Sequence, residues 1–239
     1  MTSSPPRHPW RIPLSPPERR GRFLALLALA AALIAVLAIT LSQCLGGDTA
    51  APVKPWMDGS THGRWFSVFN GHGTNSGDND SLSLSPMAAE DPGTTHAGLV
   101  VSTASYGDLR YGARMRTIRQ LRDPSPNPWE VPWLVWAYTD PEHFYYITLK
   151  PNGWELGKRD PVYPGGQRFL ATGKEQFPVG KDYKVVVEQH GPVLTVTVAD
   201  DHPDHPLVTF TDTERPYLQG RVGAYTEDAT VKFEDLKVS

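Results

Sequence analysis

Residues 183–199, YKVVVEQHGPVLTVTVA, contain two apolar-rich segments joined by a short tip. Valine, threonine and tyrosine dominate both segments, and these residue types are typical of β-strands. The tip, His190–Pro192, holds a glycine within about three residues, a common length for the connection of an antiparallel hairpin. The stretch therefore predicts a β-hairpin and favours an all-β fold.

The same signals of short strands continue in both directions from this hairpin. We find no segment of about 12 residues beyond the N-terminal region with the 3.6-residue apolar period of a helix. The further predicted strands are Arg64–Phe69, Gly98–Ser102, Ala113–Arg122, Trp129–Tyr138, His143–Lys150, Gly153–Leu156, Leu207–Thr211, Arg221–Tyr225 and Thr230–Val238. Two stretches, Gly71–Thr95 and Gly153–Phe169, have the composition of polar loops. So many short strands predict one jelly-roll sandwich of two antiparallel sheets over residues 56–239.

Charge is distributed unevenly along the 239 residues, whose formal net charge is −3. The first 45 residues hold five arginines and one acid, which leaves 18 basic and 25 acidic residues in the remainder, a net of about −7. Nucleic-acid binding depends on clustered lysine and arginine that displace counterions. The acidic remainder therefore excludes nucleic acid as a partner.

Phe23–Ile39 is entirely apolar, and with the two following residues it reaches about 19 residues, enough to cross a bilayer. Three arginines precede this run and no basic residue follows it before Lys54, which places the N-terminus in the cytoplasm. We predict a disordered cytoplasmic tail (residues 1–22), one transmembrane helix serving as a signal anchor (23–45), a linker (46–55) and an extracytoplasmic domain (56–239) at the cell membrane. A lipoprotein signal with Cys44 as the lipidated residue, or a cleaved secretory signal, would place the domain on the same side.

Two further segments of the sequence follow patterns that are found in a known protein family. Gly220–Val238 follows the pattern G-x-V-G-x-Y-T-E-x-A-x-V-x-F-x-x-L-x-V, and Phe144–Tyr146 is followed by GWELGK at residues 153–158. With these features the outer domain resembles the concanavalin A-like lectin/glucanase superfamily, closest to bacterial 3-keto-disaccharide hydrolase-type and laminarinase-like domains. The resemblance implies two curved sheets whose concave face holds carbohydrate, and a structural calcium near the last strand, with Glu234 and Asp235 as metal ligands.

The same resemblance does not extend to catalysis. Laminarin-type glucanases carry their paired carboxylates as E-x-D-x-x-E on one strand, which retaining hydrolysis requires. This spacing does not occur in the chain. No catalytic residue is therefore assigned.

Two groups of residues are candidates for ligand binding. Glu130, Trp136 and Tyr138 fall on one face of a regular strand, where rings could stack on a sugar and a carboxylate could bind its hydroxyls. The second group lies in the polar stretch after Gly153 and consists of Trp154, Lys158, Asp160 and Gln167. The alternatives are indoles packed in the core and a surface loop held by ion pairs.

Other charged residues allow two interpretations. Arginines recur along one predicted strand, at Arg114, Arg116, Arg119 and Arg122. Arg116 and Arg122 either face acidic sugars or pair with Glu130. Asp78–Asp80 supply oxygen ligands of the kind calcium prefers, without the full spacing of a calcium loop.

The sequence therefore predicts a membrane-anchored, non-catalytic glycan-binding module of a bacterial cell envelope, with a polysaccharide or glycan as partner. A glycoside hydrolase or lyase acting on oxidised sugars, and a protein-interaction domain of the envelope, are the alternatives. An enzyme needs ionisable groups that converge in a cleft. A lectin needs an accessible aromatic platform, and an interaction domain needs a broad apolar patch.

Overall fold

The computed structural model describes residues 54–198 and 205–239. The predicted cytoplasmic tail, the membrane segment with Cys44 and nearly all of the linker lie outside these residues. Within the described ranges, no helix is both long enough and apolar enough to cross a membrane. The described residues cover almost all of the predicted sandwich.

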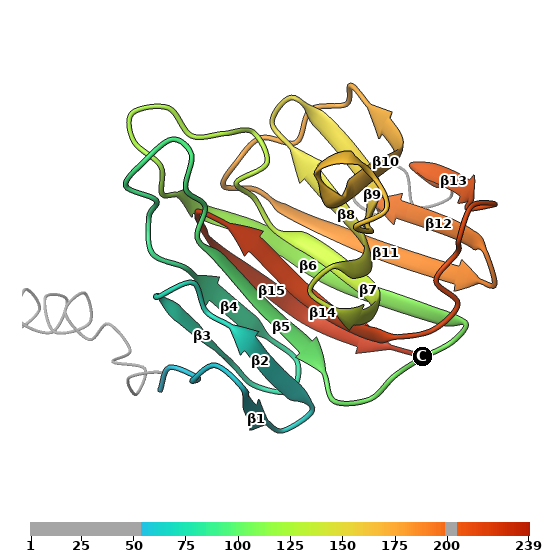
Figure 1. The fold of residues 1–239 in the computed structure, drawn as a ribbon, viewed down its shortest axis with the longest axis horizontal. Helices are drawn as coiled ribbons and strands as arrows, with labels where there is room; N and C mark the ends of the chain where they lie inside the picture. The colour runs from blue at the N-terminus through green and yellow to red at the C-terminus, as the bar shows by residue number, and fades with distance from the viewer. Residues whose placement is uncertain (1–53, 199–204) are drawn as a thin grey trace, which may run out of the picture. The chain divides into compact units, whose positions relative to one another are not determined.

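Two antiparallel sheets pack face to face (Figure 1). The eight-stranded sheet has the order β1-β2-β5-β14-β7-β8-β9-β10. Its strands are β1 (Ser60–His62), β2 (Trp65–Phe69), β5 (Ala97–Ser102), β7 (Trp133–Asp140), β8 (His143–Lys150), β9 (Gly153–Arg159), β10 (Gln167–Gly173) and β14 (Arg221–Glu227). The seven-stranded sheet has the order β13-β12-β11-β6-β15-β4-β3. Its strands are β3 (Thr74–Gly77), β4 (Leu82–Ser85), β6 (Leu109–Gln120), β11 (Asp182–His190), β12 (Val193–Val198), β13 (Val208–Thr211) and β15 (Ala229–Val238). The prediction of an all-β sandwich is confirmed.

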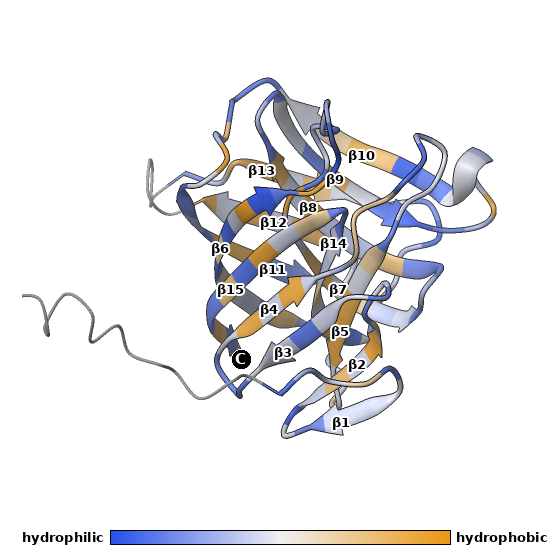
Figure 2. Ribbon diagram, turned by 90° about the vertical axis from the view of Figure 1, so that its left-hand side faces the viewer, coloured by the Kyte–Doolittle hydropathy of each residue, from blue (hydrophilic) through white to orange (hydrophobic). Residues whose placement is uncertain are grey.

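The core lies between the two sheets. Successive side chains of a strand point to opposite faces, so one apolar residue in two suffices to build it. On β12, Leu194, Val196 and Val198 are buried while the residues between them are partly exposed. Figure 2 shows orange segments alternating with blue and pale ones along β15. Trp65 and Phe233 are among the largest side chains buried in this core.

The hairpin predicted first is present as β11 and β12. Gln189 pairs with Leu194, and Gly191 at the tip has φ 55°, a left-handed conformation that favours glycine. β11 also pairs with β6, which in turn pairs with β15. The hairpin is thus joined to the middle of the seven-stranded sheet.

The expectation of a polar loop over Gly71–Thr95 is wrong, because this stretch contains β3 and β4. Leu82 and Leu84 are fully buried on β4, although serines surround them in the sequence. The buried Asn75 side chain donates hydrogen bonds to Ser67 Oγ (3.0 Å) and to the Phe69 carbonyl (2.8 Å). Pairing with β15 and these cross-sheet hydrogen bonds compensate for the polar composition.

The expected loop over Gly153–Phe169 is also shorter than predicted. β9 continues to Arg159 and β10 begins at Gln167, so the connection is limited to residues 160–166 with a 3₁₀ turn, η1 (Pro164–Gly166). Gly165 and Gly166 have φ of 72° and 67° and allow the chain to reverse there.

Candidate functional site

β7 contains an irregularity that decides which side chains reach its outer face. Ala137 has φ 51°, and the pairing with β8 shifts between Trp136 and Asp140. Trp136 therefore points into the core and is fully buried, whereas Tyr138 belongs to a second apolar cluster on the outer face. Gly220 accommodates the distortion, because a Cβ there would lie 2.2 Å from the Ala137 carbonyl carbon. The prediction that Trp136 and Tyr138 share one face is wrong, since a regular alternation does not survive the irregularity.

The outer face of β14, β7 and β8 carries an aromatic cluster, here called the aromatic face. Its rings are Trp133, Tyr138, Phe144, Tyr146 and Tyr225. The ring centroid of Trp133 lies 4.5 Å from that of Tyr146 and 5.2 Å from that of Tyr225. Such distances are typical of favourable aromatic pairs. Tyr225 is only half-buried, so part of the cluster reaches solvent.

Two rings of the aromatic face approach each other across an intervening strand. β14 and β8 are separated by β7, so their backbones lie roughly 9–10 Å apart. The rings of Tyr225 and Phe144, which come from these two strands, have centroids only 6.2 Å apart. The side chains thus lean toward one another across the intervening strand.

Polar groups border the aromatic face on the β9–β10 side. The Tyr146 hydroxyl donates to Glu155 Oε1 (3.3 Å) and accepts a hydrogen bond from Gln167 Nε2, while Glu155 also pairs with Lys150. Gly157 makes room for this ring, because a Cβ there would lie 2.3 Å from the Tyr146 hydroxyl oxygen. The result is a carboxylate, an amide and a phenol held together at the edge of a largely buried aromatic cluster.

A second carboxylate borders the cluster on β14. The Tyr225 hydroxyl donates to Glu227 Oε1 at 2.6 Å. Burial raises the pKa of the Glu227 carboxyl, and the negative charges of Asp228 and Glu130 act in the same direction. The hydrogen bond from Tyr225 and the positive charge of Arg159 oppose this shift of the pKa. Arg159, Gln167 and Glu227 are each half-buried.

We expect Glu227→Gln to stabilise the protein at neutral pH but not in acid. A carboxyl whose pKa is raised by folding costs nothing below its unfolded pKa, about 4.3, and destabilises the native state as the pH rises above that value. The gain in unfolding free energy should therefore grow with pH and level off above the folded pKa. Denaturant unfolding from pH 3 to 8 measures it, with Glu90→Gln at an exposed position as the control. A gain that is the same at every pH would contradict the raised pKa.

Three of the other predicted ligand-binding residues face away from the aromatic face. Trp154 and Lys158 lie on β9, and Asp160 directly follows it. Trp154 packs in the core and donates its indole N–H to Glu175 at 2.7 Å. Asp160 is buried, with one carboxylate oxygen 3.3 Å from Arg215 Nε. Lys158 is fully buried on the inner side of the sheet.

Lys158 has a complete set of partners. Its ammonium donates to Asp212 Oδ2 at 2.8 Å and to the carbonyl oxygens of Glu214 and Arg215 at 2.6 and 3.1 Å. Tyr145 donates to the same Asp212 oxygen at 2.6 Å. These bonds hold the segment after β13 against the sheet, which is a structural role for the lysine.

Glu130 is buried at the end of the sandwich in an ion-pair network. Arg122 Nε lies 2.7 Å from Glu130 Oε1, and Arg122 Nη2 lies 2.7 Å from Asp228 Oδ2. Of the two interpretations of Arg122, the structure shows the pairing with Glu130. Among the predicted ligand-binding residues, only Tyr138 and Gln167 therefore lie on or beside the aromatic face.

The predicted metal ligands are engaged in ion pairs. Asp235 pairs with Arg114, and Glu234 lies 2.6 Å from Lys232 Nζ. A shallow hollow brings both acids near residues 78–81, but Asp78 Oδ1 already accepts the N–H groups of Asp80 and Ser81 at 2.8 Å each. In the part of the chain that the structure describes, no group of three or more His, Cys, Asp or Glu residues is arranged to hold a metal. The structure shows no metal site at these described residues.

Several residues of the aromatic face and its polar border were not assigned to a ligand site from the sequence: Trp133, Phe144, Tyr146, Tyr225 and Glu227. A signal was available in HFYYITLK at residues 143–150, which is apolar at nearly every position. A strand that is apolar on both faces has both faces covered by other groups. In β8 one face meets the core and the other meets the aromatic cluster.

No protein-family model and no curated protein sequence matches the chain. Solved structures do share its architecture. The carbohydrate-binding module CBM66 from Bacillus subtilis has a TM-score of 0.56 at 17% identity, covering 79% of this chain and 99% of that one. A glycosyl hydrolase family 16 protein from Mycobacterium smegmatis has a TM-score of 0.50 at 11% identity, with coverages of 78% and 96%.

A third similar structure is the exoplasmic/lumenal domain of VIP36 in its Ca²⁺/Man3GlcNAc-bound form. Its TM-score is 0.50 at 12% identity, covering 75% of this chain and 84% of that one. At such identities the likeness concerns the fold alone.

Proposed function

We propose that this concanavalin A-like jelly roll is a glycan-binding module whose site is the aromatic face of the eight-stranded sheet. The observation that carries the proposal is the half-buried Tyr225 ring between a carboxylate, Glu227, and the rings of Trp133 and Phe144. Sugars present apolar ring faces and hydroxyl edges, so aromatic rings bordered by hydrogen-bonding groups match both.

The neighbours in fold support the same class of ligand. One is named a carbohydrate-binding module, and another was solved with a mannose-containing glycan. The polar border adds specificity, because Glu155 accepts hydrogen bonds while Gln167 both donates and accepts them. Arg159 contributes a planar group with several donors.

We infer that the module does not hydrolyse its ligand. Glu155 on β9 and Glu227 on β14 are three strand spacings apart, about 14 Å between backbones. Glycosidases that use two carboxylates hold them about 5–9.5 Å apart. The alternative, a hydrolase or lyase, would release product from the bound glycan. We expect none by chromatography after prolonged incubation.

Tyr225→Ala should weaken glycan binding by about thirtyfold or more, because loss of an aromatic anchor typically costs at least 2 kcal/mol. The tightest ligand is first selected from an array of neutral and acidic oligosaccharides, with and without a chelator, and its affinity is then measured by calorimetry. Ile118→Ala, at an exposed apolar position on the other sheet, should leave affinity unchanged. A folded Tyr225→Ala protein with wild-type affinity would contradict the proposed site.

We further propose that residues 23–45 anchor the module with its C-terminal domain outside the cytoplasm. The arginines before Phe23 and the apolar run after them support this orientation. A reporter active only outside the cytoplasm should function when fused after Ser239, and a cytoplasmic reporter should not. Cys44→Ala should leave the protein in the membrane fraction. Release of this variant into the soluble fraction would favour the lipoprotein alternative.

A further inference from the structure

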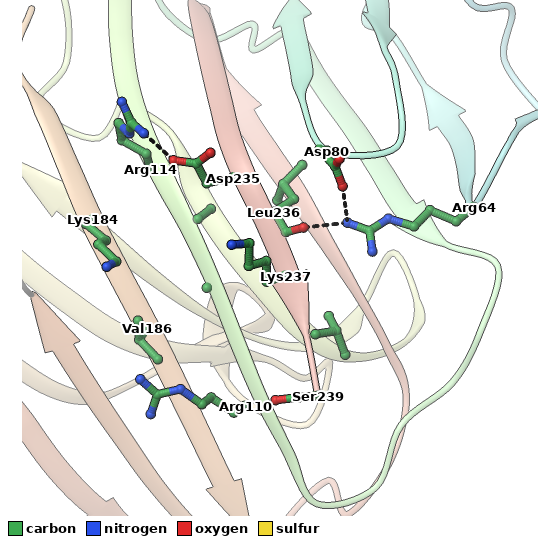
Figure 3. A pocket seen from close by; sticks show the side chains of 13 residues that line it. Arg64, Asp80, Arg110, Arg114, Lys184, Val186, Asp235, Leu236, Lys237 and Ser239 are labelled. Carbon is green, nitrogen blue, oxygen red and sulfur yellow. Dashed lines mark hydrogen bonds and ion pairs between the residues drawn. The ribbon is translucent and has the colours of Figure 1, made fainter.

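The outer face of the seven-stranded sheet holds a hollow of about 640 Å³. It lies on the side of the sandwich opposite to the aromatic face. Figure 3 shows the side chains that line it. Its floor is a cross-strand row in which Gly112 on β6 stands between Val186 on β11 and Lys237 on β15. A Cβ at Gly112 would lie 3.3 Å from Val186 Cγ2. Because Gly112 has no side chain, the floor of the hollow is deepest in the middle of β6.

Cationic side chains surround this floor. They are Arg64, Arg110, Arg114, Lys184 and Lys237, against two carboxylates, Asp80 and Asp235. Arg110 and Arg114 are four residues apart on β6, about 13 Å along the strand, one on each side of Gly112. The lining therefore has a net positive charge, although the chain beyond residue 45 is acidic.

A bulge in β15 builds one wall of the hollow. The pairing with β6 shifts between Glu234 and Lys237, and Asp235 has φ 54°. Leu236 turns into the core and is 1% exposed, while Asp235 faces outward toward Arg114. Bulges of this kind redirect side chains and are common beside functional sites.

The cations are available to an incoming ligand. Arg110 pairs with Glu188 and Arg114 with Asp235, but the two guanidinium side chains are 58% and 46% exposed. Ion pairs at such exposure contribute little stability and can exchange partners. Arg64 is engaged more firmly, since its Nη2 donates to the Leu236 carbonyl at 2.6 Å and lies 3.9 Å from Asp80 Oδ1. Within the described residues, the Lys237 ammonium has no hydrogen bond or ion pair.

We call this hollow, with the cations that line it, the cationic groove. We propose that it binds an acidic polysaccharide, a chain whose sugars carry carboxylate or sulfate groups. Arginine and lysine provide charge-assisted donors for those anions. Asp80 and Asp235 can accept hydrogen bonds from sugar hydroxyls. A polyphosphate has no such hydroxyl groups and would only be repelled by the two carboxylates. The recessed floor at Gly112 suits a narrow chain, whereas a flat lipid surface would not reach it. The groove is separate from the aromatic face and adds a second binding surface to the module.

The test uses the full chain carrying Tyr225→Ala, so that binding at the aromatic face is weakened and the two proposals can fail independently. Polygalacturonate and dextran sulfate are the acidic probes, and neutral dextran is the control. We expect both acidic probes to bind, and their affinity to fall as salt rises from 50 to 500 mM because exposed charges are screened. Absence of binding at 50 mM would overturn the proposal.

Two double variants distinguish binding in the groove from nonspecific attraction of an acidic chain to a positively charged surface. Arg110→Gln with Lys237→Gln should reduce affinity for polygalacturonate about tenfold or more, since two charge-assisted contacts are lost. Arg116→Gln with Lys232→Gln removes the same charge from the same sheet outside the groove, and should change affinity less than about twofold. Equal losses in the two double variants would overturn the proposal.

A third variant tests the floor without changing any charge. Gly112→Ser should fold, because its Cβ meets only side-chain and backbone atoms at 3.3 Å or beyond, and it should weaken polygalacturonate binding by filling the hollow. Wild-type affinity in this variant, or equally strong binding of wild-type protein to phosphatidylglycerol vesicles, would contradict a groove for a saccharide chain.

Discussion

Trp136→Ala is expected to lower the free energy of unfolding by about 3–5 kcal/mol, the usual cost of truncating a large aromatic residue in a packed interior. Trp136 is fully buried, and its ring centroid lies 5.7 Å from that of Tyr145. The neighbouring strands are held on both sides by sheet pairing and cannot close the resulting cavity. Denaturant unfolding followed by tryptophan fluorescence and circular dichroism measures the loss.

The same experiment distinguishes a core residue from a ligand platform. Trp129, which is 42% exposed, is the matched control. Trp129→Ala should change the unfolding free energy by less than about 0.5 kcal/mol. At a temperature where Trp136→Ala is still folded, its glycan affinity should equal that of the wild type. Normal stability with lost binding would instead place Trp136 in the binding site.

Arg122→Met is expected to destabilise the protein by about 3–5 kcal/mol, because it leaves two buried carboxylates without their counter-charge. Glu130 and Asp228 have side-chain exposures of 0% and 1%. Arg122 also donates to the carbonyl oxygens of Asp91 (3.1 Å) and Thr94 (2.9 Å). One guanidinium thus joins the loop before β5, the segment after β6 and the turn between β14 and β15.

Two further variants test whether the cost comes from the unpaired charges. Arg116→Met removes a partly exposed arginine whose Nη1 lies 3.5 Å from Asp182, and should cost no more than about 1 kcal/mol. Adding Glu130→Gln and Asp228→Asn to Arg122→Met should recover part of the lost stability, since neutral amides are cheaper to bury than carboxylates. An Arg122→Met protein as stable as Arg116→Met would show that the network contributes little.

Most strands of the sandwich could be predicted from the sequence, because a strand is recognised from the residue types and the alternation within a few neighbouring positions. Alternation of apolar and polar residues in β11 and β12, and the glycine at their tip, require only neighbours in sequence. The closing run at residues 220–238 carried enough of the pattern to indicate the concanavalin A-like fold, which the structural neighbours confirm. β3 and β4 were missed, because Leu82 and Leu84 are too few to show a period among serines.

The face on which a side chain lies was predictable only where the strand is regular. Left-handed residues at Ala137 and Asp235 change the alternation, and sequence offers no sign of either. Trp136 and Tyr138 were assigned one face for this reason. Arg114 and Arg116 both point outward from β6, because that part of the strand is regular.

The sequence by itself determined an all-β sandwich, the hairpin of β11 and β12, and the separation of an apolar N-terminal run from an acidic domain. Only the tertiary structure decided which polar residues are structural and which border a surface. Lys158 meets Asp212 across 54 residues, and Arg122 meets Asp228 across 106. The aromatic face and the cationic groove likewise combine strands that are far apart in the chain. Such contacts depend on strand order and on the curvature of each sheet, which arise from packing of the whole domain and not from local propensity.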